Sequence, residues 1–271
     1  MAENSSGRST LTRRLGIAVV VLLVAVVSYY LTTREEHNPI TGEDQRVALS
    51  VEQEIALGLQ ARPEMMQEYG GLDPSQEGQQ RIDRIGERIV AQSAAGQSPY
   101  KFEFHLLDDA ETVNAFALPG GQIFMTEGLY KLLDTDEEIA GVLAHEVGHV
   151  IARHSSEQMA RAKLTEGLAK AGQIAVYDPE NPQSSEMKAK MAQLVSAMVS
   201  MKYGRDDELE SDDLGVRFMV ESNYDPHAMI EVMKVLDQAS QGNRPPEFMS
   251  THPDPDNRIE KIKAAIAKYS R

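Results

Sequence analysis

The ten residues VLAHEVGHVI, Val142 to Ile151, decide how this chain folds. Their flanks are Val, Leu, Ala and Ile, which is the pattern of a helix buried in a protein core. The centre of the stretch nevertheless carries His145, Glu146 and His149. Burying such groups is unfavourable unless each of them has a partner. The stretch therefore predicts a buried helix whose polar side chains are satisfied by something outside it.

Composition limits the chemistry that can satisfy these groups. The chain has 271 residues, 41% of them hydrophobic, which is enough for one substantial domain with a core. Its formal net charge of −15 disfavours nucleic acid and anionic lipid surfaces as partners. It has no cysteine, which excludes disulfides, thiolate metal sites and a Cys nucleophile. A metal would have to be bound by Asp, Glu or one of seven histidines, namely His37, His105, His145, His149, His154, His227 and His252.

An apolar stretch near the N-terminus, LGIAVVVLLVAVVSYYL at residues 15–31, carries no charge. As a helix it would span roughly 25 Å, the low end for crossing a bilayer. Its flanks carry opposite charges, with Arg8, Arg13 and Arg14 before it and Glu35 and Glu36 after it. The positive-inside rule then predicts a single-pass membrane anchor with the folded domain outside the cytoplasm. The alternative is a cleaved signal peptide, which would leave the domain free beyond the membrane.

Hydrophobic spacing predicts a mostly helical α+β domain with a small sheet. By composition the segments are a cytoplasmic N-terminus (1–14), the anchor (15–31), a linker (32–46) and the domain (47–271). The predicted strands are 100–107, where His105 is expected to be structural, a strand before the turn Pro119-Gly120-Gly121, and 122–126. The predicted helices are 47–66, 74–92, one from the capping box of Thr135 and Glu138 through His154, 155–176, 185–202, 206–221, 226–240 and 256–267.

The two histidines of HEVGH are four residues apart, so on a helix they share one face, with Glu146 beside them. The pattern H-E-x-x-H on a helix is a mechanism-bearing motif of zinc hydrolases, in which the two imidazoles bind the metal and the Glu takes a proton from water. A chance match on an exposed helix is the alternative, and three fixed residues in five make it improbable. We therefore expect one Zn²⁺ per chain, bound by His145 and His149.

A third metal ligand must come from elsewhere, because a catalytic zinc site has three protein ligands and one open position. The candidate segment is RDDELESDDLG, residues 205–215. Glu208 and Asp212 share a helical face, so Glu208 can bind the metal while Asp212 orients a ligand His through its other ring nitrogen. Glu210 is the competing third ligand, although it points to a different face. A solvated acidic run is the alternative interpretation of the segment.

In these residues the sequence resembles family forty-eight of the metallopeptidases, a gluzincin group with a zincin-type core. That family includes CAAX prenyl proteases, HtpX-type quality-control proteases, mitochondrial Oma-type proteases and periplasmic relatives. The resemblance rests on HEVGH, the downstream E-x-x-x-D, NAFALPGGQIFMTEGL at 114–129 and THPDPDNRI at 251–259. These motifs follow in the family's order over residues 114–260. Lacking several transmembrane helices and a helical repeat array, the chain is expected to be a minimal member on a single anchor, and prenylated substrates are improbable.

The resemblance implies a zinc endopeptidase that hydrolyses unfolded or misassembled envelope proteins on the periplasmic side of the cell membrane. Glu146 would be the base, and an extended substrate would pair with a strand, either 122–125 or the one formed by Asn114, Ala115, Phe116 and Ala117. The resemblance also places His252 near the metal, where it would either stabilise the oxyanion or occupy the open position and keep the enzyme latent.

Two other functions remain open at the level of sequence, a metal-containing holdase or chaperone that does not cleave and a zinc hydrolase for a non-peptide substrate. Residues 160–203 lie between the two halves of the metal site and form either a mobile cover or part of the core. The sequence carries no indication of an oligomeric state.

Overall fold

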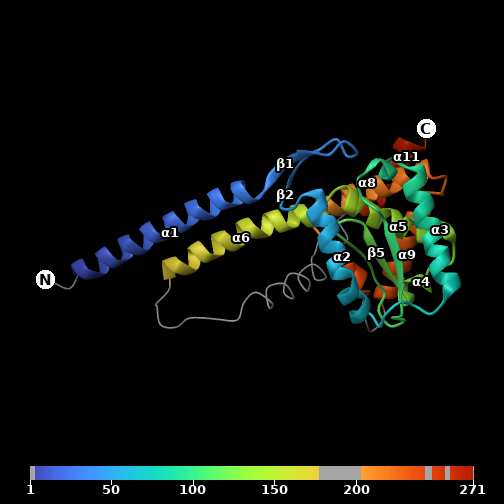
Figure 1. Cartoon of the computed structure of the whole chain (residues 1–271), viewed down its shortest axis with the longest axis horizontal. Coiled ribbons are helices and arrows are strands. Elements are labelled where there is room, and N and C mark those ends of the chain that lie inside the picture. The colour runs from blue at the N-terminus through green and yellow to red at the C-terminus, as the bar shows by residue number, and fades with distance from the viewer. Residues whose placement is uncertain (1–3, 177–202, 242–245, 254–256, 271) are drawn as a thin grey trace.

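The computed structural model describes residues 4–176, 203–241, 246–253 and 257–270. They form a folded body from which two helices, α1 (Asn4–Thr32) and α6 (His154–Val176), extend side by side as an arm (Figure 1). Several apolar side chains of α1 are exposed, including Leu23, Val24 and Leu31. Within these ranges no helix combines the length and the apolar character that crossing a bilayer requires. The membrane-spanning helix expected at 15–31 is therefore not confirmed.

The body contains a three-stranded sheet in the order β3-β5-β4. Strand β3 (Glu103–Leu107) runs parallel to β5 (Gln122–Thr126), and β4 (Ala115–Leu118) runs antiparallel to β5. The predicted strands on both sides of the Pro-Gly-Gly turn are confirmed, and Gly120 and Gly121 there have φ of +85° and +104°. The buried ring of His105 binds Gln122 of the neighbouring strand, with 3.0 Å between Nε2 and Oε1, as its predicted structural role requires.

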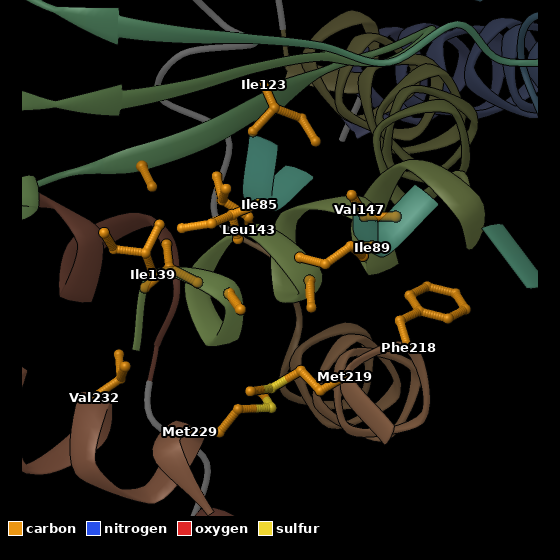
Figure 2. Packing of buried hydrophobic residues seen from close by; sticks show 14 of the residues in the cluster. Ile85, Ile89, Ile123, Ile139, Leu143, Val147, Phe218, Met219, Met229 and Val232 are labelled. Atoms are coloured by element: carbon orange, nitrogen blue, oxygen red, sulfur yellow. The ribbon is translucent and has the colours of Figure 1, made fainter. Parts of the chain in front are cut away.

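Helices surround the sheet and supply most of the core. They are α2 (Val51–Glu68), α3 (Gln76–Gln92), the short η1 (Ala94–Gln97) and α4 (Glu127–Tyr130), α5 (Asp136–Ile151), α8 (Arg205–Glu221), α9 (Ala228–Ser240), α10 (Glu247–Thr251) and α11 (Arg258–Tyr269). Helix α5 begins at the predicted capping box, in which Thr135 and Glu138 satisfy each other's backbone N–H groups. Figure 2 shows Leu143 and Val147 of α5 at the centre of the core, between Ile123 of the sheet and Met219 of α8.

The segment predicted to be a linker, residues 32–46, is instead a hairpin attached to the body. Strand β1 (Arg34–His37) pairs with β2 (Asp44–Val47). The Asn38 side chain donates a hydrogen bond of 2.7 Å to the carbonyl of Ile151, and Gln45 donates to the carbonyl of Ala152. Both carbonyls lie at the C-terminal end of α5, where the helix itself offers no donor. The linker prediction was wrong because the segment binds the end of α5 through side-chain amides.

The helix that carries HEVGH ends earlier than predicted. Helix α5 ends at Ile151 and α6 begins at His154, so one helix does not run through His154. Between them Arg153 has φ of +56°, the left-handed conformation that ends a helix. Its guanidinium is held by Glu54 at 3.1 Å and donates to the carbonyl of Leu49 at 2.8 Å. Contacts from distant segments therefore stabilise a break that local periodicity does not predict.

Two sequence predictions lie wholly or mostly outside the described residues. The helix predicted at 185–202 belongs to the undescribed range 177–202. The same holds for most of the segment 160–203 that was expected to form either a cover or part of the core. Its beginning is part of α6, and its last residue, Tyr203, lies in the body, buried to 8% exposure.

Candidate metal centre

The site is built on the buried face of α5 against α8. His145, Glu146 and His149 are each no more than 2% exposed. The two helices approach closely at Gly148, where an added Cβ would lie only 2.7 Å from Ser211 Oγ and 2.9 Å from the Ser211 carbonyl oxygen. Ser211 Oγ donates a hydrogen bond of 2.5 Å to the backbone carbonyl of His145. This close approach brings Glu208, one turn before Ser211, to the two imidazoles.

Four side chains converge at this point: His145, His149, Glu208 and His252 each offer one ligand atom within 4.8 Å of the others. The Nε2 atoms of His145 and His149 are 3.0 Å apart. Glu208 Oε2 is 3.6 Å from His145 Nε2, and its Oε1 is 3.5 Å from His149 Nε2. The structure thus brings together the three predicted ligands and His252, which the family resemblance places near the metal. Glu210 is not part of the cluster.

The donor set fits a divalent transition-metal ion. Both oxygens of Glu146, Glu208 Oε2 and His252 Nε2 are buried and have no hydrogen-bond partner in the part of the chain that the structure describes. Buried polar atoms without partners are rare and unfavourable, so their gathering in one place indicates a site for a ligand. Imidazole and carboxylate donors without sulfur are suited to zinc and related ions. A bound ion would be held by His145, His149 and Glu208.

Asp212 lies next to His145, on the same face of α8 as Glu208. Its Oδ1 lies 2.9 Å from His145 Nδ1, which leaves Nε2 facing the cluster. Asp212 is in turn held by the buried Arg258 of α11, whose Nε donates to Oδ2 at 2.7 Å and whose Nη2 donates to Oδ1 at 2.9 Å. Burial raises the pKa of Asp212, but Arg258 and His145 offset this, so the pKa lies below its usual value. The group is a carboxylate that accepts from His145.

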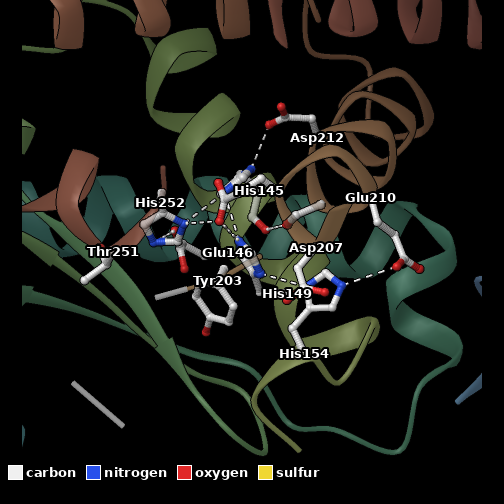
Figure 3. Close-up of polar contacts among 12 residues, drawn as sticks. His145, Glu146, His149, His154, Tyr203, Asp207, Glu210, Asp212, Thr251 and His252 are labelled. Atoms are coloured by element: carbon white, nitrogen blue, oxygen red, sulfur yellow. Dashed lines mark hydrogen bonds and ion pairs between the residues drawn. The ribbon is translucent and has the colours of Figure 1, made fainter. Parts of the chain in front are cut away.

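The other ligand histidine has a different environment, which the sequence did not reveal. His149 Nδ1 lies 2.8 Å from Nδ1 of His154, and the ring of Tyr203 stacks on His149 with the centroids 3.9 Å apart. Figure 3 shows His154 between His149 and Glu210. His154 is one of the three histidines to which the sequence analysis assigns no role, and the only sequence signal for it is its place five residues after His149.

His252 enters the cluster from the end of α10. It is fully buried, its ring stacks on Phe248, and its Nδ1 lies 3.1 Å from Glu208 Oε1. Its Nε2 lies 3.6 Å from Glu146 Oε1. His252 therefore contacts both a predicted ligand and the predicted base. Burial raises the pKa of Glu146, an effect that the neighbouring His252 and His145 only partly offset.

The segment predicted to bind substrate lies at the edge of the sheet. Ala115, Phe116 and Ala117 belong to β4, which pairs with β5 on one side, and no strand in the described ranges pairs with its other side. Asn114, just before β4, is buried, and its Nδ2 donates to Glu247 Oε1 of α10 at 3.2 Å. This edge of β4 is unpaired but buried, since residues 115–118 are no more than 9% exposed, and Asn114 connects the start of β4 to the helix that carries His252.

Together, an H-E-x-x-H helix, a carboxylate from a second helix and an unpaired strand edge define the class of metallopeptidases. Comparison with known proteins agrees. The model of Peptidase family M48 matches residues 76–266. The chain belongs to this metallopeptidase family, whose members are metal-dependent.

Named relatives are proteases of two kinds. The chain is 30% identical over 230 residues to the beta-barrel assembly-enhancing protease of Yersinia pestis, and the aligned region covers 82% of this chain and 45% of that protein. It is 30% identical over 251 residues to the mitochondrial metalloendopeptidase OMA1 of Schizosaccharomyces pombe, covering 89% of this chain and 69% of that protein. The chain thus spans less than half of the length of the first of these relatives and about two thirds of the second.

Proposed function

We propose that this chain is a zinc-dependent endopeptidase that cleaves unfolded or misassembled proteins of the cell envelope. One observation carries the proposal: the two oxygens of Glu146 are buried beside the three metal-binding side chains and accept no hydrogen bond from the described residues. A residue that only stabilised the fold would have partners. The identity of the relatives as proteases supports peptide bonds as the substrate.

Each residue of the site has a chemical task in this proposal. A zinc ion held by His145, His149 and Glu208 would polarise the scissile carbonyl and acidify water. Glu146, with its pKa raised by burial, accepts the proton of the attacking water and passes it to the leaving amine. Asp212 keeps the Nε2 atom of His145 turned toward the ion. The unpaired edge of β4 would bind the substrate through backbone hydrogen bonds, which suits unfolded chains of varied sequence.

For His252 we propose the latent arrangement over the oxyanion role. Four protein groups converge at the site, whereas a catalytic zinc ion keeps one position open. The Nδ1 atom of His252 faces Glu208 and its Nε2 atom faces Glu146. With an ion bound, the ring in this conformation would occupy the position that water and the substrate carbonyl need. Displacing the ring would then accompany substrate binding.

We also propose that residues 15–31 attach the chain to a membrane, with residues 32–271 on its periplasmic side. The apolar side chains exposed along α1, among them Val20, Leu23 and Val24, support attachment. The charged flanks of the segment support the orientation. A reporter that is active only in the cytoplasm, fused to the C-terminus, should stay silent. Recovery of the full chain in the soluble fraction would contradict the proposal, and cleavage at about residue 28 would favour the signal-peptide alternative.

The activity is tested by incubating the full chain with an unfolded protein such as casein, in parallel with Glu146→Gln, and measuring bound zinc in both. We expect the wild-type chain to cleave casein and the variant to bind the same amount of zinc without cleaving. The holdase alternative would be favoured if the wild-type chain and the His252→Ala variant both bound zinc and prevented aggregation, and neither cleaved casein. Equal cleavage by Glu146→Gln and wild type would disprove the role of the base.

A further inference from the structure

We infer that His154 and Glu210 are positioning residues for His149, acting through hydrogen bonds that run outward from the metal centre. The inference rests on the proposed role of His149 as a ligand. Nδ1 of His149 lies 2.8 Å from Nδ1 of His154, and Nε2 of His154 lies 3.3 Å from Glu210 Oε2. Figure 3 shows the three side chains in this order. The His154 side chain is 1% exposed and that of Glu210 is 34% exposed, so the hydrogen bonds connect the buried site to the surface.

The position of each hydrogen atom follows from the metal-binding role. His149 faces the cluster with Nε2, which must present a lone pair, so its hydrogen is on Nδ1. The Nδ1 atom of His154 must then accept, which places the hydrogen of His154 on Nε2, facing Glu210. The carboxylate of Glu210 accepts that hydrogen and so selects the tautomer of His154 that can hold His149.

The break between α5 and α6 makes this contact possible. On a continuous helix, residues 149 and 154 would point in directions about 140° apart. The left-handed conformation of Arg153 instead turns the chain, so that the first residue of α6 faces back to His149. Arg153 is kept in this conformation by Glu54 and by the carbonyl of Leu49. The turn and its buried ion pair thus serve to place His154.

The two ligand histidines are therefore supported unequally. His145 donates directly to the carboxylate of Asp212, which is 1% exposed and held by Arg258. His149 depends on a neutral imidazole, whose own orientation depends on a partly exposed carboxylate. Glu210, which the sequence analysis considers as a competing third ligand, thus has a separate role. It contacts His154, which in turn contacts the ligand His149.

The test measures zinc affinity of the full chain by competition with a chelator. His154→Phe keeps a ring of similar size but cannot accept a hydrogen bond, and we expect about 10- to 100-fold weaker zinc binding. His154→Gln offers a carbonyl oxygen to His149 and an amide N–H to Glu210, and we expect it to restore most of the affinity. Glu210→Leu removes only the outer acceptor, and we expect a smaller loss than in His154→Phe.

His105→Phe is the matched control, because it also replaces a buried, hydrogen-bonded histidine ring, but on strand β3 rather than at the metal-binding cluster. We expect it to change the free energy of unfolding of the metal-free chain and not the zinc affinity. Unchanged zinc affinity in His154→Phe would overturn the inference. So would equal losses in the Gln and Phe variants, because packing alone would then explain them. A wild-type chain that bound no zinc would instead disprove the proposed function.

Discussion

At the scale of single residues, Arg258 is the buried cation that neutralises carboxylates of the site. It is among the largest side chains buried to less than 2% exposure, and it contacts the carboxylates of both Asp212 and Glu208. Replacing it leaves two buried carboxylates without their counter-charge. We therefore expect Arg258→Met to lower the free energy of unfolding by about 3–5 kcal/mol, measured by urea denaturation with a chelator present.

Lys263→Met is the control for that prediction, because Lys263 lies on the same helix and forms an ion pair with Glu260 in which both side chains are more than half exposed. Exposed pairs of this kind contribute little, so the unfolding curve should hardly change. A similar small effect of Arg258→Met would show that the buried carboxylates are stabilised by other groups.

His252 gives a second prediction at this scale. If its ring keeps the site closed, His252→Ala should raise the basal rate of casein cleavage and weaken zinc binding, because one of four converging groups is removed. Initial rates under saturating zinc separate the two effects. A fall in kcat of about a hundredfold at unchanged zinc content would instead assign the ring to oxyanion stabilisation. Unchanged rates and zinc affinity would show that the ring takes part in neither.

Which residues of the site the sequence could predict depends on how they are connected. His145 and His149 lie on one helix, and so do Glu208 and Asp212, and in each case a spacing of four fixes a common face. The spacing could not show that His154, Tyr203 and Arg258 would approach these residues, because each comes from another element or across a break. The position of His252 was expected only through the family resemblance.

At the scale of elements, the close approach of α5 and α8 depends on Gly148. A Cβ there would lie 2.9 Å from the backbone oxygen of Ser211, which cannot move without shifting α8 and its ligand Glu208. We expect Gly148→Ala to lower the free energy of unfolding by about 1–3 kcal/mol, despite the better helix propensity of Ala, and also to weaken zinc binding. Urea denaturation and chelator competition measure the two effects.

Gly141→Ala on the same helix is the matched control. Its Cβ would lie 3.3 Å from Cγ of the flexible Met229 side chain and 3.6 Å from the Met229 backbone, an ordinary van der Waals distance, so we expect little change or a small gain in stability. If both glycines tolerated alanine equally, helix propensity rather than the contact between α5 and α8 would explain their presence.

The elements themselves were predicted best where hydrophobic residues repeat with a clear period. Helix α3, with Ile82, Ile85 and Ile89 on its buried face, is an example. The hairpin was missed because its strands, REEH and DQRV, are short, mostly charged or polar, and lack alternating apolar residues. The end of α5 was missed because the break at Arg153 is stabilised by Glu54 and Leu49, about a hundred residues away in the chain.

At the scale of the whole molecule, the N-terminal hairpin is bound by hydrogen bonds to the end of α5, the helix that carries the metal ligands. Two side-chain amides, from Asn38 and Gln45, donate to the last carbonyls of α5, and the two amides also bind each other at 2.9 Å. Glu36 of the same hairpin pairs with Arg153, which turns the chain toward α6. The hairpin therefore connects the arm of α1 and α6 to the end of the helix that bears the metal ligands (Figure 1).

This connection predicts that the hairpin stabilises the body. In the double variant Asn38→Ala with Gln45→Ala, two buried carbonyls lose their donors, and we expect the free energy of unfolding to fall by about 2–4 kcal/mol in urea denaturation. The control is His37→Ala with Asp44→Ala, which removes an exposed pair from the same hairpin, with side chains 62% and 70% exposed. It should leave the unfolding curve almost unchanged, since exposed pairs contribute little. Equal, small effects of the two double variants would mean that the hairpin does not stabilise the body. A loss confined to the first would show that residues 32–46 belong to the cooperative unit that contains the metal centre, because the first variant removes the buried amides that hold the hairpin together and join it to α5, whereas the second removes only an exposed pair.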